Sequence, residues 1–201
     1  MTLSPNVVWQ PTEVDRSSRD RRLGMRGATV WFTGLPSSGK STLAAAVEER
    51  LTADGIAAYV LDGDNLRHGL NGDLGFDEQA RAENVRRTAH VARLFADAGV
   101  VALVSLVSPY AADRELARSL HEEAGLPFVE VYVNAPVSVC ERRDPKGLYA
   151  RARRGEISGF TGVDDPYEPP LRPELEILPA PIERSVDAVL TELDAQGVRG
   201  G

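Results

Sequence analysis

A short loop between an apolar run and a pair of hydroxyl residues has the composition of a phosphate-binding loop. Within VWFTGLPSSGKST, which spans residues 30–42, the pattern G-x-x-x-x-G-K-[ST] is satisfied by Gly34, Gly39, Lys40 and Ser41. Backbone N–H groups of such a loop can surround phosphates, Lys40 can reach the β- and γ-oxygens, and the Ser41 hydroxyl can hold Mg²⁺. The loop therefore predicts binding of a nucleoside triphosphate with Mg²⁺, through Gly34, Ser37, Ser38, Gly39, Lys40, Ser41 and Thr42.

Acidic and basic residues follow a second apolar run and could act on a second substrate. The sequence YVLDGDNLRHGL places Asp62 and Asp64 directly after that run, with Arg67 three residues further on. A carboxylate near the phosphate loop can hold Mg²⁺ through water or accept the proton of an attacking hydroxyl, and Arg67 can bind an anionic acceptor. Taken alone, the DGDN segment is also compatible with a solvated turn. The neighbouring His68, considered by itself, is expected to be structural.

Short β-rich runs alternate with longer helical patterns along the chain. The strand-like runs are residues 28–33, 57–61, 100–107 and 128–133, and the helix-like runs are 41–53, 77–98, 111–124 and 182–196. This alternation predicts an α/β fold of the P-loop NTPase type, in which helices flank a central parallel sheet of about five strands in three layers. In such a sheet the strand end that carries Asp62 opens onto the ligand crevice. Residues 164–183 hold six prolines, so we expect them to be extended outside the regular layers.

Composition and charge argue against several classes of function. The net charge of −7 argues against general nucleic-acid binding, although residues 16–26 and 142–154 are locally rich in Arg. Each basic segment is either a solvated surface or a site for a small anionic substrate. The longest apolar run, residues 98–107, is too short for a membrane helix, and with no secretory signal we expect a cytoplasmic protein without a membrane partner. The single Cys140 reads as a half-buried helix position without chemistry.

The class of phosphate-loop protein depends on residues downstream of the loop. A GTPase switch would need a guanine-reading N-K-x-D segment, and this sequence has none. A motor would need more chain for oligomer contacts and an acidic pair that ends a long apolar strand. These differences favour a kinase of a small molecule, and they argue against specificity for GTP.

Three longer segments resemble the adenylyl-sulfate kinase (APS kinase) family. They are LDGDNLRHGLNGDLGFDEQARAENVRR, SLVSPYAADR and CERRDPKGLYARARRGEISGFTGVDDPYEPP, and the similarity extends over residues 6–178. Members of this family transfer the γ-phosphoryl group of ATP to the ribose 3′-hydroxyl of adenosine 5′-phosphosulfate (APS), giving PAPS and ADP for sulfate assimilation or sulfate transfer. The resemblance implies the same reaction here, with ATP and Mg²⁺ as cofactors and a helical lid over the nucleotides at about residues 142–168.

The resemblance also implies roles for individual residues. Lys40, Asp62 and Ser108 match catalytic positions, Asp62 being the base or the Mg²⁺-organising carboxylate, and Ser41 and Asp62 match the metal site. The positions that match APS-binding residues are Asp64, Asn65, Leu66, Arg67, Phe76, Arg81, Asn84, Val107, Ser108, Lys146, Gly159 and Phe160. In bacterial members the serine equivalent to Ser108 is assigned as a phosphoserine intermediate. Phosphoryl transfer needs positioning and charge neutralisation more than a covalent relay, so we expect Ser108 to position substrate instead.

The chain is expected to have two parts and to assemble with other chains. We expect an N-terminal arm at residues 1–26 and a kinase domain at 27–201, with the resemblance implying a homodimer, an arm that reaches the partner's site and a possible association with ATP sulfurylase. The sequence departs from the family at Gln10, at Ala111 and at Pro36-Ser37, where Ser-Gly is commoner. Two alternatives stay open: a non-catalytic domain that senses APS or PAPS, and a kinase of another small alcohol.

Overall fold

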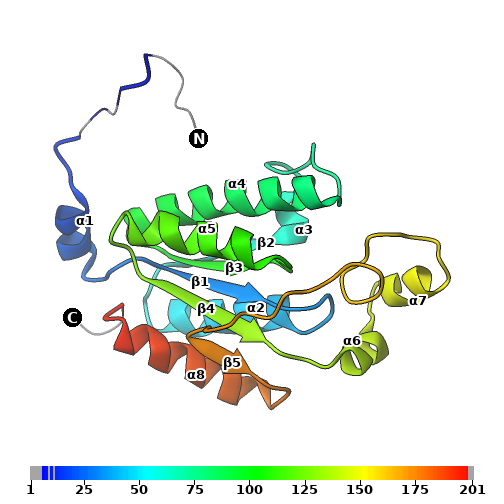
Figure 1. Ribbon diagram of the computed structural model, residues 1–201. Helices are drawn as coiled ribbons and strands as arrows, with labels where there is room; N and C mark the ends of the chain where they lie inside the picture. Colours follow the sequence, from blue (N-terminus) through cyan, green and yellow to red (C-terminus); the bar gives the residue numbers. More distant parts are fainter. Residues whose placement is uncertain (1–5, 9, 11, 199–201) are drawn as a thin grey trace.

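Five parallel strands form the centre of the molecule (Figure 1). The computed structural model describes residues 6–8, 10 and 12–198, so positions 1–5, 9 and 11 of the expected arm and 199–201 of the expected domain lie outside it. The strand order is β2-β3-β1-β4-β5. The strands are β1 (Ala28–Thr33), β2 (Ala58–Asp62), β3 (Val101–Ser105), β4 (Phe128–Val133) and β5 (Leu175–Ile177). This arrangement confirms the predicted parallel sheet.

Helices cover both faces of the sheet, which makes the predicted three layers. On one face α2 (Lys40–Ala53) and α8 (Ile182–Ala195) pack against the strands, and on the other face lie α4 (Glu78–Asp97) and α5 (Ala111–Glu122). All six residues of β1 are buried, as expected for a central strand that is covered on both sides. The helix expected over residues 77–98 is confirmed as α4, and the Asp77 carboxylate caps it by accepting the Ala80 N–H at 2.9 Å.

Four shorter helices lie at the two ends of the sheet. They are α1 (Arg16–Leu23), α3 (Gly63–Leu66), α6 (Val137–Arg143) and α7 (Leu148–Arg153). Figure 1 shows α6 and α7 beyond the carboxyl ends of the strands and α1 at the opposite end. Two arginines hold α1 there: Arg16 donates to the Ala124 carbonyl, and Arg19 pairs with Asp97. No helix in the described part of the chain has both the length and the apolar composition needed to cross a bilayer.

Two expectations are wrong in detail. The proline-rich segment is not wholly outside the regular layers, because Leu175–Ile177 forms the edge strand β5. The run between Pro173 and Pro179 keeps its N–H groups, so it can pair with β4 where the prolines cannot. Cys140 is fully buried rather than half-buried, because α6 packs it in a small cluster with Ala135 and Tyr149.

A buried histidine makes the stability of this fold depend on pH. His121 is 0% exposed, its Nδ1–H donates to the Ala117 carbonyl, and its Nε2 accepts from the Thr29 hydroxyl, both at 2.8 Å. Burial lowers the pKa of His121 from 6.5 to about 4. Between these pH values His121 binds a proton in the unfolded chain but stays neutral in the folded chain. The contribution of neutral His121 to the free energy of unfolding is therefore complete above about pH 6.5 and is lost as the pH falls toward 4.

We therefore expect His121→Gln to flatten the acid limb of the stability curve. Wild type should lose up to roughly 3 kcal/mol more than the variant between pH 7 and pH 4, since one pKa unit corresponds to about 1.4 kcal/mol. Chemical denaturation at a series of pH values measures the difference. The same change at the exposed His68 is the matched control and should leave the slope as in wild type. Equal slopes in wild type and His121→Gln would contradict this account.

Candidate active site

The phosphate loop joins β1 to α2 and borders a cleft of about 1600 Å³. No side chain caps the start of α2, so its first N–H groups are free to meet an anion. Gly34 and Gly39 have φ values of 147° and 110°, and a Cβ on Gly34 would lie 2.6 Å from the Val133 carbonyl oxygen. Glycine is thus required at Gly34 both by conformation and by space. All of the predicted loop residues except Gly34 line the cleft: Ser37, Ser38, Gly39, Lys40, Ser41 and Thr42.

Lys40 lies within the loop with its ammonium group close to backbone carbonyls. Its Nζ donates to the Gly34 carbonyl at 3.0 Å and to the Leu35 carbonyl at 2.8 Å. Burial lowers the pKa of Lys40 to about 8, against the opposing attraction of Asp62 and other anionic groups. The side chain is therefore still mainly charged at pH 7.

The unusual Pro36-Ser37 pair has a structural setting. Ser37 has φ 60°, in the left-handed region that favours glycine, and glycine is the commoner residue at this position in the family that the sequence resembles. Two residues next to the loop hold its backbone: the Tyr149 hydroxyl donates to the Pro36 carbonyl at 3.1 Å, and Arg143 donates to the Ser38 carbonyl at 2.8 Å. The helices α6 and α7 thus hold the phosphate loop from outside.

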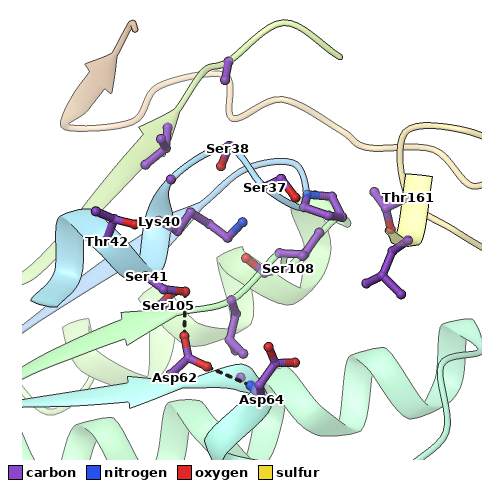
Figure 2. Close-up of a pocket in the computed structure, with 18 of the residues that line it drawn as sticks. Ser37, Ser38, Lys40, Ser41, Thr42, Asp62, Asp64, Ser105, Ser108 and Thr161 are labelled. Carbon is purple, nitrogen blue, oxygen red and sulfur yellow. Dashed lines mark hydrogen bonds between the residues drawn. The ribbon is translucent and has the colours of Figure 1, made fainter. Parts of the chain in front are cut away.

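Ser41 and Asp62 face each other beside the loop (Figure 2). The Ser41 hydroxyl donates to Asp62 Oδ2 at 2.7 Å and lies 3.1 Å from the Ser105 hydroxyl, while Asp62 Oδ1 accepts the Asp64 N–H at 2.9 Å. No group of three or more His, Cys, Asp or Glu side chains in the described residues could enclose a metal. One carboxylate with hydroxyl groups fits Mg²⁺, which keeps several waters and phosphate oxygens as ligands.

The acceptor side of the cleft is formed by α3, the loop after it and the start of α4. Asp64, Asn65 and Arg67 line the cleft there, whereas Leu66 packs into the core beneath α4 and does not reach it. Phe76 is 64% exposed, and the Arg67 guanidinium lies 4.1 Å from its ring centre. An aromatic ring this exposed, with a cation against it, is suited to stacking on a planar ligand.

Two α4 residues, Arg81 and Asn84, also line the cleft. Arg81 donates to the Phe76 carbonyl at 2.8 Å and to the Gly159 carbonyl at 2.7 Å, so it connects α4 to the lid. The Asp164 carboxylate accepts the N–H groups of Gly159 and Phe160, which fixes the lid backbone at this point. The Phe160 ring meets the Tyr149 ring edge-on at 4.9 Å and forms part of the cleft wall.

Lys146 crosses the cleft from the lid. Its ammonium group contacts the Asp64 carboxylate, which joins the lid to α3 in this structure. Both side chains are more than half exposed, and solvent-exposed ion pairs contribute little to stability. The contact can therefore exchange readily for a contact with an anionic ligand.

Val107 and Ser108 lie in the cleft beyond the end of β3, and Ser108 has φ 39°. Ser108 is 3% exposed, its hydroxyl accepts from Trp31 Nε1 at 3.1 Å, and it donates to the Thr33 hydroxyl at 3.0 Å. Among the described residues no carboxylate or imidazole is hydrogen-bonded to this hydroxyl. The group is therefore already committed as donor and acceptor and has no base to activate it as a nucleophile.

We expect Ser108→Ala to keep measurable activity. The variant loses two buried hydrogen bonds of about 1 kcal/mol each, which limits the expected loss to roughly thirtyfold. Steady-state kinetics gives the residual kcat, and intact-protein mass spectrometry after incubation with ATP reports any phosphoprotein. Complete loss of turnover, together with a phosphorylated Ser108 in wild type, would contradict the positioning role.

Sequence reasoning missed a further set of residues on the other side of the phosphate loop. They follow β4 and β5 or begin the lid, and they line the cleft: Asn134, Ala135, Arg143, Leu178, Pro179 and Ala180. Ser105, at the end of β3, was missed as well. Their common signal is position, because all but Arg143 stand at or just after the carboxyl end of a strand, where ligands bind in open α/β sheets. For Leu178, Pro179 and Ala180 this signal could not be used, because the surrounding prolines prevented β5 from being predicted as a strand.

Comparisons with known proteins show the family that this chain resembles. A family model described as adenylylsulphate kinase matches residues 26–178. The adenylyl-sulfate kinase of Aeromonas hydrophila is 54% identical over 190 residues, covering 94% of this chain and 95% of the relative. The bifunctional enzyme CysN/CysC of Mycobacterium tuberculosis is 54% identical over 192 residues, covering 96% of this chain but 30% of the relative. The structure of M. tuberculosis APS kinase CysC with AMPPNP and APS superposes with a TM-score of 0.83 at 56% identity, covering 85% of this chain and 99% of that one.

Proposed function

The chain belongs to the adenylylsulphate kinase family, and from this we propose that it transfers the γ-phosphoryl group of ATP to the ribose 3′-hydroxyl of APS, giving PAPS and ADP. The observation that carries the proposal is that the phosphate loop and a second, cationic and aromatic side line the same cleft. A one-nucleotide protein needs only the loop, whereas Phe76, Arg67 and Arg81 provide contacts for a second anionic nucleotide.

On the donor side, the loop amides and Lys40 bind the triphosphate. The base of ATP then extends away from Asp62, toward the wall formed by Ala135 and by Leu178, Pro179 and Ala180. This wall is largely apolar, which suits a purine face. Ser41 and Asp62 are the residues that would hold Mg²⁺, and the ion would supply charge neutralisation for the triphosphate.

On the acceptor side, Phe76 and Phe160 contact the adenine of APS, while Arg67 and Arg81 compensate the charge of its phosphosulfate. Asp62 lies between the two halves, so its carboxylate is placed to orient the attacking 3′-hydroxyl and to accept its proton. Lys146 and the arginines of the lid add positive charge as the lid closes and excludes water. The chain thus acts by positioning and electrostatics, without a covalent intermediate on Ser108.

Both alternatives are less well supported. A domain that only senses APS or PAPS does not need catalytic groups. Here Lys40, Ser41 and Asp62 all line the cleft, and Ser41 donates to Asp62. A kinase of another small alcohol would be favoured if Phe76, Arg81 and Asn84 faced away from the cleft, and all three line it. The geometry therefore supports a catalyst with a nucleotide acceptor.

The test of this function is ADP production with MgATP and a panel of acceptors. We expect micromolar APS to raise ADP release far above the rate with buffer, AMP, adenosine or a simple sugar alcohol, and PAPS to be identified by mass spectrometry. ADP release that is no faster with APS than with buffer would refute the proposal. Faster release with another alcohol than with APS would favour the alternative kinase.

The expected partners also remain proposals. A homodimer is implied by the family resemblance alone, and residues 16–23 of the expected arm form α1, which packs at the end of the sheet away from the cleft through Arg16 and Arg19 (Figure 1). Association with ATP sulfurylase is supported by the bifunctional CysN/CysC relative, of which this chain spans only a part. Light scattering on the isolated chain, alone and mixed with a sulfurylase, tests both, and a monomer that binds no sulfurylase would refute them.

A further inference from the structure

A buried asparagine with no part in the chemistry above lies directly behind the acceptor site. Asn71 belongs to the loop between α3 and α4 and is 0% exposed. Its backbone N–H donates to the Leu66 carbonyl, and its side chain points at α4. There it meets Asn84, which lines the cleft and is expected to contact the acceptor nucleotide.

The hydrogen bonds around Asn71 determine which way its amide faces. The Thr88 hydroxyl donates to the Asn84 carbonyl at 2.8 Å, one helical turn back, so its oxygen is left as an acceptor. Asn71 Nδ2 therefore faces Thr88, at 3.5 Å, and donates to Asn84 Oδ1 at 2.6 Å. Turning the Asn71 amide over would place its carbonyl oxygen against the Thr88 oxygen, two acceptors without a proton between them.

The amide of Asn84 is oriented as a consequence. Its Oδ1 is taken by Asn71, so its Nδ2, with two N–H groups, is the end that remains for the cleft. No hydrogen bond within the described part of the chain engages that nitrogen. We infer that Asn71 is a positioning residue that holds Asn84 as a hydrogen-bond donor toward the acceptor nucleotide. This inference rests on the proposed function, because it assumes that the acceptor nucleotide binds at Asn84.

The fixed orientation of the Asn84 amide predicts which ligand atoms the acceptor site prefers. A fixed donor selects a lone pair, such as a purine ring nitrogen or a ribose or phosphosulfate oxygen, and leaves a ligand with an N–H or O–H at that point unpaired. Sites built around such a buried hydrogen bond reject the wrong partner far more strongly than apolar contacts do. Asn84 without Asn71 would turn freely between its two ends and lose this preference.

The unpaired side-chain carbonyl of Asn71 argues that this residue positions Asn84 and does not serve the fold alone. Asn71 Oδ1 is buried without a hydrogen-bond partner in the described residues, and a buried unpaired polar atom is destabilising. An apolar residue of the same size, such as leucine, would remove that penalty. If Asn71 served only the fold, the polar side chain would be a poor choice, whereas as a guide for Asn84 it is needed.

The experiment compares Asn71→Leu and Asn71→Asp with wild type. We expect Asn71→Leu to raise the KM for APS about tenfold while the KM for ATP and the melting temperature stay near wild type. In its ionised form Asn71→Asp presents only acceptors, so Asn84 must turn its N–H groups inward and its oxygen to the cleft, and the rise should approach hundredfold at a pH where the carboxyl is ionised. Where the buried carboxylate prevents folding, Asn71→Leu alone carries the test.

A double-mutant cycle with Asn84→Ala shows whether Asn71 acts through Asn84. Asn71→Leu should add nothing to the KM for APS once Asn84 is alanine, because residues that act as a unit are non-additive. Full additivity, an unchanged KM for APS in Asn71→Leu, or equal rises in both KM values would overturn the inference. Failure of wild type to phosphorylate APS would instead refute the proposed function and this inference with it, so the two failures are distinguishable.

Discussion

Replacing Lys40 with alanine is expected to abolish phosphoryl transfer, with kcat reduced by about 10³-fold or more. The chain has only two lysines, and Lys40 is the one within the phosphate loop. Its Nζ donates to the carbonyls of Gly34 and Leu35 inside the loop that we propose binds the phosphates. Charge that develops on the transferred group would lose its nearest fixed cation in the variant, and loop amides alone would remain. Steady-state ADP release with saturating MgATP and APS measures the loss.

The loss should not come from unfolding. Lys40 is 7% exposed, and burial lowers its pKa, so the native fold keeps this charge at a cost in stability. Lys40→Ala should therefore melt at or above the wild-type temperature. Lys146→Ala is the matched control: it removes an exposed lid lysine paired with Asp64 and should raise the KM for substrate more than it lowers kcat. A Lys40→Ala enzyme that keeps more than a tenth of the wild-type rate would refute the assignment.

The elements predicted well are those whose signal is local. The bounds of β1 were predicted as residues 28–33 because a continuous apolar run followed by the phosphate loop leaves little choice. The helix α4 was predicted to within one residue at each end because Asp77 caps it and its apolar residues recur at helical spacing. The strand β5 was missed because three residues between prolines carry no local signal. It forms only where β4 offers an edge and Glu174 accepts the Glu130 N–H.

The candidate site divides in the same way. The phosphate loop and the Asp62, Asp64 and Arg67 group are recognisable from adjacent residues, whereas the other acceptor-side residues were identified only through family resemblance. The residues that support them come together only in the fold. Arg114 is an example, because charge in a helix pattern indicates a solvated surface, yet this side chain is 3% exposed. It donates to the Ser108 carbonyl at 2.7 Å and to Glu130 at 2.8 Å, and so connects α5, β4 and the cleft.

The second large effect is expected at Asp62, where asparagine should lower kcat by about 10²- to 10³-fold. The carboxylate accepts the Ser41 hydroxyl at 2.7 Å and is the acidic group that we propose for both the metal and the attacking hydroxyl. Asparagine keeps the shape and one oxygen, which can still accept the Asp64 N–H and cap α3. It lacks the negative charge and cannot take up a proton. The fold should therefore persist while the positioning of phosphate and hydroxyl fails.

Asp64→Asn is the matched control, since it makes the same change two residues along the chain. The Asp64 side chain is exposed and pairs with Lys146, so its loss should weaken lid closure and raise the KM for APS, with less than a tenfold change in kcat. Kinetics with each substrate varied in turn separates the two patterns. If Asp62→Asn changed only KM while Asp64→Asn removed kcat, the two carboxylates would have exchanged roles, and the acceptor hydroxyl would lie nearer the lid than we propose. If neither variant lost more than tenfold in kcat, the reaction would proceed without a carboxylate at this strand end.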